Sequence, residues 1–164
     1  MKCKVISTGS KGNAVIANDE ILVDCGVPYK MIEPYAAKLK IVLLTHEHSD
    51  HFRKNTIAKL HFEHPALRFG CCEWLKDKLI NTIDEGRLDV YRVGSTYRYA
   101  NFDITPIQLY HDVPNCGYRI YSNGEKGIYM TDTKTVEGIV AKGYDLYMIE
   151  ANYEDWELEQ RLSS

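Results

Sequence analysis

Thr45-His46-Glu47-His48-Ser49-Asp50-His51 is the most informative part of this sequence, and it follows directly after an apolar run. It gathers three imidazoles and an aspartate, a density typical of a metal site and not of a solvated polar loop. If the loop is extended, His46 and His48 project to the same side and can bind one ion. Asp50 and His51 lie past the bend, where they can face a second ion about 3.5 to 4 Å away. Imidazole and carboxylate together suit zinc, manganese or iron, so these residues leave the metal open among the three.

The motif Thr-His-X-His-X-Asp-His, placed after the apolar run Ile41–Leu44, resembles the signature of the metallo-β-lactamase superfamily, whose members are mostly dimetal hydrolases. The resemblance extends from about Lys4 to Tyr153. It implies the α/β fold of that family, an αββα four-layer sandwich in which helices pack outside two sheets. It also implies three later ligands: a downstream histidine, an aspartate that bridges the metals, and a final histidine near the C-terminus.

Two residues follow expected strands in the way that the resemblance requires. His111 comes just after an expected strand over Phe102–Leu109 and matches the family's third ligand to the first metal. Asp132 comes just after an expected strand over Gly127–Met130 and matches the aspartate that bridges both metals, although an isolated aspartate there would more often be a helix cap. The resemblance makes Asp50 and Asp132 catalytic as well as metal-ligating residues.

Two further aspartates are expected behind or beside the ligands. Asp24 ends the apolar strand Ile21–Asp24, and the matching aspartate of the family lies beneath the metals and orients a ligand imidazole through its other nitrogen. From the residues alone, Asp24 could equally be a strand cap. Asp112 follows His111 and could orient an imidazole, donate a proton or cap the loop.

The expected ligands are divided unequally between two ions. The first ion would have three nitrogens and one oxygen, from His46, His48, His111 and Asp132. The second would have Asp50, His51 and the shared Asp132, because no histidine follows His111. Water or a neighbouring chain, and hence a homo-oligomer, would have to complete the second site, so we expect its ion to bind more weakly. The missing histidine also favours a chain whose C-terminal helical part is incomplete, with a helix just begun near residue 156.

Length and composition are those of one globular domain over residues 1–164. The formal net charge of −3 offers no case for avid nucleic-acid binding, although it leaves room for a local basic patch. No apolar run approaches the roughly 18 residues of a membrane span, and Met1–Lys4 does not begin a signal peptide. We therefore expect a cytoplasmic protein without membrane association, whose five cysteines are reduced; Cys25 and Cys116 are expected to be buried thiols and not ligands.

The glycine-rich segment Ser7-Thr8-Gly9-Ser10-Lys11-Gly12-Asn13 and the later Leu22-Val23-Asp24-Cys25-Gly26 resemble the bacterial and phage branch of the superfamily that is related to DNA exonucleases and phosphodiesterases. The first segment could cradle a phosphate through its backbone amides or could be an ordinary hairpin. Four cations could line one rim of the site: Lys11, Arg53, Lys54 and Lys59.

The resemblance implies a metal-dependent hydrolase, most specifically a phosphodiesterase or nuclease acting on nucleic acid. Its two divalent ions, zinc foremost, would activate a bridging water that attacks phosphorus, so that no serine or cysteine nucleophile is required. Two alternatives stay open. One is a hydrolase for a small thioester, lactone or cyclic phosphodiester, and the other is a non-catalytic metal-binding relative.

Hydrophobic spacing predicts several elements around these motifs. Pro28–Lys38 is expected as a helix that is broken or kinked at Pro34, since proline lacks a donor and clashes one turn back. Asn55–Glu63 is expected as a helix that turns Phe62 inward. Val136–Ala141 is interpreted as a short helix.

Overall fold

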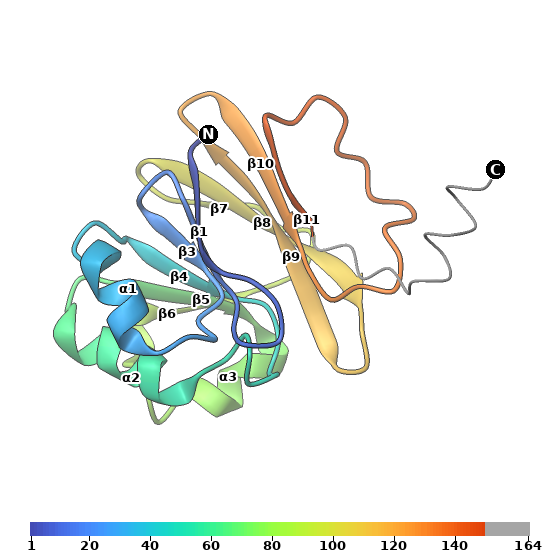
Figure 1. Ribbon diagram of the computed structural model, residues 1–164. Helices are drawn as coiled ribbons and strands as arrows, with labels where there is room; N and C mark the ends of the chain where they lie inside the picture. The colour runs from blue at the N-terminus through green and yellow to red at the C-terminus, as the bar shows by residue number, and fades with distance from the viewer. Residues whose placement is uncertain (150–164) are drawn as a thin grey trace.

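The computed structural model describes residues 1–149 and arranges them around two β-sheets (Figure 1). The first sheet has six strands in chain order, in which β1 to β3 pair antiparallel and β3 to β6 pair parallel. Its strands are β1 (Cys3–Ser7), β2 (Ala14–Ala17), β3 (Ile21–Val23), β4 (Ile41–Leu44), β5 (Arg68–Cys72) and β6 (Leu88–Tyr91). The helix expected near residue 156 lies outside the described residues.

Three helices connect the parallel strands and cover one face of the first sheet (Figure 1): α1 (Tyr29–Ala36), α2 (Lys54–Glu63) and α3 (Glu73–Leu79). A 3₁₀ turn, η1 (Glu85–Arg87), precedes β6. Parallel neighbours need such crossover connections, and crossovers of one hand place their helices on the same side. Along β4, Val42 and Leu44 pack into the core under the helices, whereas Ile41 and Leu43 pack toward the second sheet. Because β4 is buried on both faces, it is apolar throughout.

The second sheet has five strands in the order β11-β10-β9-β8-β7. They are β7 (Tyr97–Arg98), β8 (Phe102–Tyr110), β9 (Pro114–Ser122), β10 (Glu125–Met130) and β11 (Leu146–Ile149). β8 and β9 form a long hairpin that stays paired from Phe102 with Ser122 to Tyr110 with Pro114. Ile104, Tyr118 and Ile120 of this hairpin pack against the first sheet. His111 and Asp112 therefore lie on the tight turn of the hairpin.

The predicted sandwich is confirmed in its sheets and in its one described helical layer. Within residues 1–149, no helix covers the outer face of the second sheet; the loop after β10 lies there instead (Figure 1). Its side chains Ile139, Ala141 and Tyr144 pack on Leu109 and Ile128. No helix in the described part of the chain is long and apolar enough to cross a membrane.

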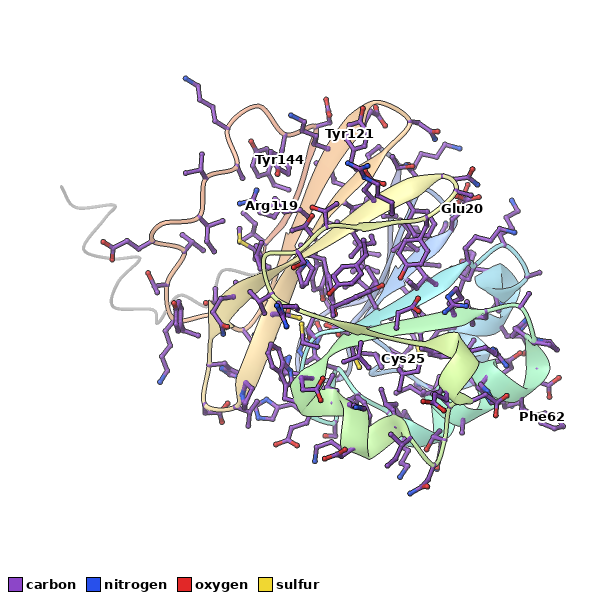
Figure 2. All side chains as sticks on the ribbon, turned by 180° about the vertical axis from the view of Figure 1, so that it is seen from behind. Glu20, Cys25, Phe62, Arg119, Tyr121 and Tyr144 are labelled. Atoms are coloured by element: carbon purple, nitrogen blue, oxygen red, sulfur yellow. The ribbon has the colours of Figure 1, made fainter. Side chains whose placement is uncertain are left out.

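Two local predictions are wrong, and a third is wrong in part. α1 is one continuous helix and not two pieces, because Pro34 is exposed and Ala36 ends the helix soon after it, so that the ring removes only one bond near the end. The alternative, a kink at Pro34, stays a prediction. Phe62 is 80% exposed and points away from the core at the end of α2 (Figure 2). The segment 136–141 is not helical, since Gly138 adopts a φ of 80°, which a helix does not tolerate.

Candidate metal centre

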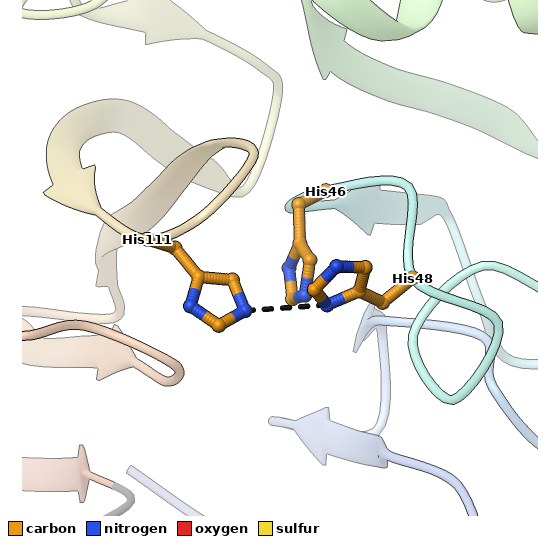
Figure 3. Close-up of side chains that lie close together, drawn as sticks. All are labelled: His46, His48 and His111. Carbon is orange, nitrogen blue, oxygen red and sulfur yellow. Dashed lines mark hydrogen bonds between the residues drawn. The ribbon is translucent and has the colours of Figure 1, made fainter.

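The predicted site residues come together where strands of both sheets end. Thr45 follows β4 and starts the loop that carries His46, His48 and His51. His111 comes from the β8–β9 turn, on the other side of the site (Figure 3). Asp132 follows β10 in a left-handed conformation, with a φ of 51°. An aspartate tolerates this conformation better than most residues, and such backbone strain is common at functional sites.

Three imidazoles form the first set of potential ligands, which we call the histidine group: His46, His48 and His111. Their ligand nitrogens all lie within 4.8 Å of one another. His111 Nε2 is 3.2 Å from His48 Nδ1, although the two residues are 63 positions apart (Figure 3). These three nitrogens can bind one ion, as a trio of imidazoles does in zinc sites.

The second set, which we call the mixed group, consists of His46, His51 and Asp132. Asp132 Oδ2 lies 2.6 Å from His51 Nε2 and 3.5 Å from His46 Nε2. The sequence assigned His46 to the first ion only, whereas its nitrogen falls within reach of both groups. The carboxylate of Asp132 stands beside this shared histidine, at the border between the groups.

Asp50 and Asp112 lie at the edges of the cluster. Asp50 Oδ2 is 3.7 Å from His51 Nε2, and these are two of the residues that were expected to bind the second ion. Asp112 is 65% exposed, and its Oδ1 lies 3.1 Å from His111 Nε2 and 3.4 Å from His48 Nε2. Asp112 therefore borders the histidine group from the solvent side. The ligand roles assigned to all these residues stay predictions.

Asp24 lies beneath the cluster and is completely buried. Its Oδ2 is 2.6 Å from His51 Nδ1, and the hydroxyl of Tyr129 donates to the same oxygen. The backbone N–H and the hydroxyl of Thr45 donate to its Oδ1 at 3.0 and 2.8 Å. A buried carboxylate needs such partners, and this one holds the Nδ1 proton of His51 so that Nε2 faces the ligand cluster.

Thr45 orients His46 in the same way, through a contact with its Nδ1. Its hydroxyl lies 2.9 Å from His46 Nδ1 and, having donated its own proton to Asp24, accepts the Nδ1 proton of the histidine. His46 Nε2 then carries a lone pair, is buried, and has no hydrogen-bond partner among the described residues. An unpaired buried acceptor aimed into a cluster of imidazoles and a carboxylate fits a divalent transition-metal ion.

The pKa values of His46 and His51, the two histidines of the mixed group, are shifted in opposite directions. Burial, reinforced by His51, lowers the pKa of His46 to about 4, which keeps its imidazole neutral and able to bind a metal. Burial acts in the same direction on His51, but hydrogen bonds to Asp132 and Asp24 outweigh it and raise its pKa to about 10. The hydrogen bond from His51 in turn lowers the pKa of Asp132. A cation at the mixed group would take the place of this proton between His51 and Asp132.

Sequence reasoning missed two residues that build the site. Asn13 donates its backbone N–H to the carbonyl of Asp50 at 2.6 Å, and its side chain lies 2.9 Å from His51 Nε2. Gly26 packs so closely that an added Cβ would lie 1.7 Å from the same carbonyl. The glycine-rich sequence predicted a phosphate-binding loop or a hairpin. In the structure, Asn13 and Gly26 also hold the loop that carries the ligand histidines, through their contacts with Asp50. Thr45 stood in the quoted motif, but only the fold shows its partners.

Two cysteines border the site. Cys25 and Cys116 are buried free thiols, as predicted. Neither belongs to the histidine group or the mixed group. The C-terminal residues 150–164, where the resemblance would place the final ligand, lie outside the described part of the chain.

Comparisons with known proteins identify the family and agree with the fold. A family model described as "Beta-lactamase superfamily domain" matches residues 20–161. Exodeoxyribonuclease WalJ of Streptococcus pneumoniae is 26% identical over 99% of this chain and 70% of its own length. Exodeoxyribonuclease YycJ of Bacillus anthracis is 26% identical over 98% of this chain and 69% of its own. The crystal structure of human tRNase Z, short form, matches with a TM-score of 0.71 at 16% identity, over 99% of this chain and 82% of that one, and shows the shared fold. Because the family model spans most of the sequence, the chain belongs to the beta-lactamase superfamily, with the metallo-β-lactamase fold.

Proposed function

We propose that this protein is a metal-dependent phosphodiesterase that hydrolyses DNA and uses zinc. The observation that carries the proposal is the position of Asp132, whose Oδ2 lies 2.6 Å from His51 Nε2 and 3.5 Å from His46 Nε2, at the border of the two donor groups. A carboxylate there can be shared by two ions, and paired ions are the arrangement used by many phosphatases and nucleases. The relatives named exodeoxyribonuclease support DNA as the substrate class.

Each residue of the centre has a role in this proposal. The histidine group would hold one ion, and His51 and Asp132, with Asp50 beside them, would hold the other. Ions bound there supply an activated water and neutralise the charge that develops on the phosphate oxygens. Asp24 keeps His51 in the ligand tautomer. Asp112, exposed beside the histidine group, can hold a proton for the departing oxygen.

The cysteines are unsuited to a covalent alternative. Burial raises the pKa of the Cys25 and Cys116 thiols, so both stay protonated and are poor nucleophiles. All five cysteines are free. Free thiols suit a reducing compartment, and a cytoplasmic location is therefore part of the proposal.

The test is turnover by the metal-reconstituted chain of three substrates: bis(p-nitrophenyl) phosphate, a thioester and linear DNA. We expect hydrolysis of the phosphodiester and of DNA, loss of both with a chelator, and recovery with zinc. Stronger recovery with manganese or iron would correct the metal. Turnover of the thioester alone would replace the proposal with a small-molecule hydrolase, and bound metal without turnover of any substrate would identify a non-catalytic relative.

A further inference from the structure

A cavity of about 420 Å³ opens beside the metal centre. It is formed by the glycine-rich loop, the end of the metal loop and the start of α2, and its lining includes Ser10, Lys11, Asp50, Arg53, Lys54 and Asn55. Asp50 belongs to both places, since its Oδ2 lies 3.7 Å from His51 Nε2. A ligand in this cavity would therefore lie directly beside a substrate held at the metals.

The charge of the cavity is positive. Lys11, Arg53 and Lys54 face a single carboxylate, that of Asp50, among the lining residues. All three cations are exposed, and none forms an ion pair within residues 1–149. In a chain with a formal net charge of −3, this concentration of unpaired cations at one cavity favours an anionic ligand.

Uncharged donors surround the cations. The hydroxyls of Ser10 and Ser49 and the amide of Asn55 line the same space. α2 begins at Lys54 without a side-chain cap, so the amides of its first turn are available to an acceptor there, and the helix dipole adds to the attraction for an anion. Phe52 is the only large apolar side chain in the lining, which makes an apolar ligand a poor fit.

We propose that this cavity is a phosphate subsite that binds a phosphate of the nucleic-acid strand next to the one being hydrolysed. The inference rests on the proposed function, which places the scissile phosphate at the metals. Of the four cations that were expected along one rim of the site, Lys11, Arg53 and Lys54 line the cavity. Lys59 does not line it and lies over the ring of Tyr29. The phosphate is either an internal one or a terminal one, and both have the chemistry that this lining recognises.

The test compares Arg53→Gln and Lys11→Gln with Lys59→Gln, which removes the same charge from α2, the helix that Arg53 directly precedes, but outside the cavity. Binding of a fluorescent single-stranded oligonucleotide is measured on the full chain in chelator, where hydrolysis cannot interfere. We expect each cavity variant to weaken binding on the order of tenfold and to make the salt dependence shallower by about 0.7 per lost phosphate contact. Lys59→Gln is expected to bind like the parent. Thermal unfolding confirms that each variant is folded.

Two oligonucleotides, with a 5′-phosphate or a 5′-hydroxyl, separate the sources of the phosphate. If the terminal phosphate is bound, Arg53→Gln weakens binding of the phosphorylated strand alone; if an internal one is bound, it weakens both equally. Equal binding of both strands by Arg53→Gln, Lys11→Gln and the parent would overturn the subsite. Turnover by the metal-loaded parent is measured separately. A parent that hydrolyses nothing while Arg53→Gln still loses binding would overturn the proposed function and leave the subsite standing.

Discussion

The histidine group and the mixed group share His46 and differ in almost every other respect. The histidine group is built from imidazoles alone, and His48 and His111 reach it from loops that are partly exposed to solvent. The mixed group is buried deeper, and its His51 is held between the carboxylates of Asp24 and Asp132. An ion at the histidine group would thus bind uncharged imidazole nitrogens. An ion at the mixed group would have to displace the proton that His51 shares with Asp132 and that balances the charge of this carboxylate. Five residues that share one histidine can therefore build two environments of unlike affinity.

Loss of Asp132 should have the largest effect on this comparison, because its carboxylate is the one that borders both groups. We expect Asp132→Asn to lose both ions and all hydrolysis above background. Asparagine is the informative replacement, since it tolerates the left-handed φ of 51° that alanine would strain. Metal analysis after gel filtration measures the outcome. A full equivalent of metal in Asp132→Asn would mean that at least one group holds its ion without this carboxylate.

Loss of Asp50 should affect only the second ion. Its carboxylate lies 3.7 Å from His51 Nε2 and belongs to neither donor group, so Asp50→Ala should lose the weaker ion and keep the one at the histidine group. Metal titrations of the parent and the variant, followed by calorimetry, measure this difference. Two equivalents of equal affinity in the parent would contradict the inequality and would point to an additional ligand.

Loss of the Asp24 charge should weaken the mixed group without removing it. Asp24→Asn keeps the shape and tolerates the φ of 61°, but it no longer accepts the Nδ1 proton of His51 with full strength. We expect metal affinity to fall roughly 10- to 100-fold, as losses behind a ligand usually do. Competition with a chromogenic chelator measures the affinity, and thermal unfolding checks the fold. An unchanged affinity would return Asp24 to the role of a strand cap.

Loss of the Thr45 hydroxyl should have the smallest effect on the metal centre. It should affect both donor groups, because the hydroxyl orients His46, which belongs to both. Thr45→Val leaves His46 Nδ1 without its partner and removes one of the two donors to Asp24 Oδ1, whose other donor is the Thr45 backbone N–H. This should lower the free energy of unfolding by about 1–3 kcal/mol. Urea unfolding of the metal-free protein measures this cost. Thr45→Ser restores the hydroxyl and is the matched control. An unchanged free energy of unfolding in Thr45→Val, which keeps the methyl group and lacks only the hydroxyl, would contradict a role for these hydrogen bonds.

Much of the fold could be predicted because short stretches of sequence determine its strands and turns. The run Ile41–Leu44 is apolar on both faces, and the turn Asn123-Gly124, with a φ of 53° and 79°, joins β9 to β10 as a hairpin. The failed predictions are those in which tertiary packing or a single backbone angle overrides local spacing. Phe62 has helical spacing but is exposed at the end of α2, and the φ of 80° at Gly138 prevents the helix that the apolar residues around it would favour.

For the site, sequence alone determined the donor types and their crowding in the loop from His46 to His51, because neighbouring residues cannot move far apart. Only the tertiary structure decided how those donors are shared. His111 meets His48 across 63 positions, and Asp24 reaches His46 only through Thr45, since both contacts depend on how two sheets pack. The cavity beside Asp50 likewise joins the glycine loop to α2. Spacing along a chain fixes local geometry, whereas the partner of each distant side chain is set by packing.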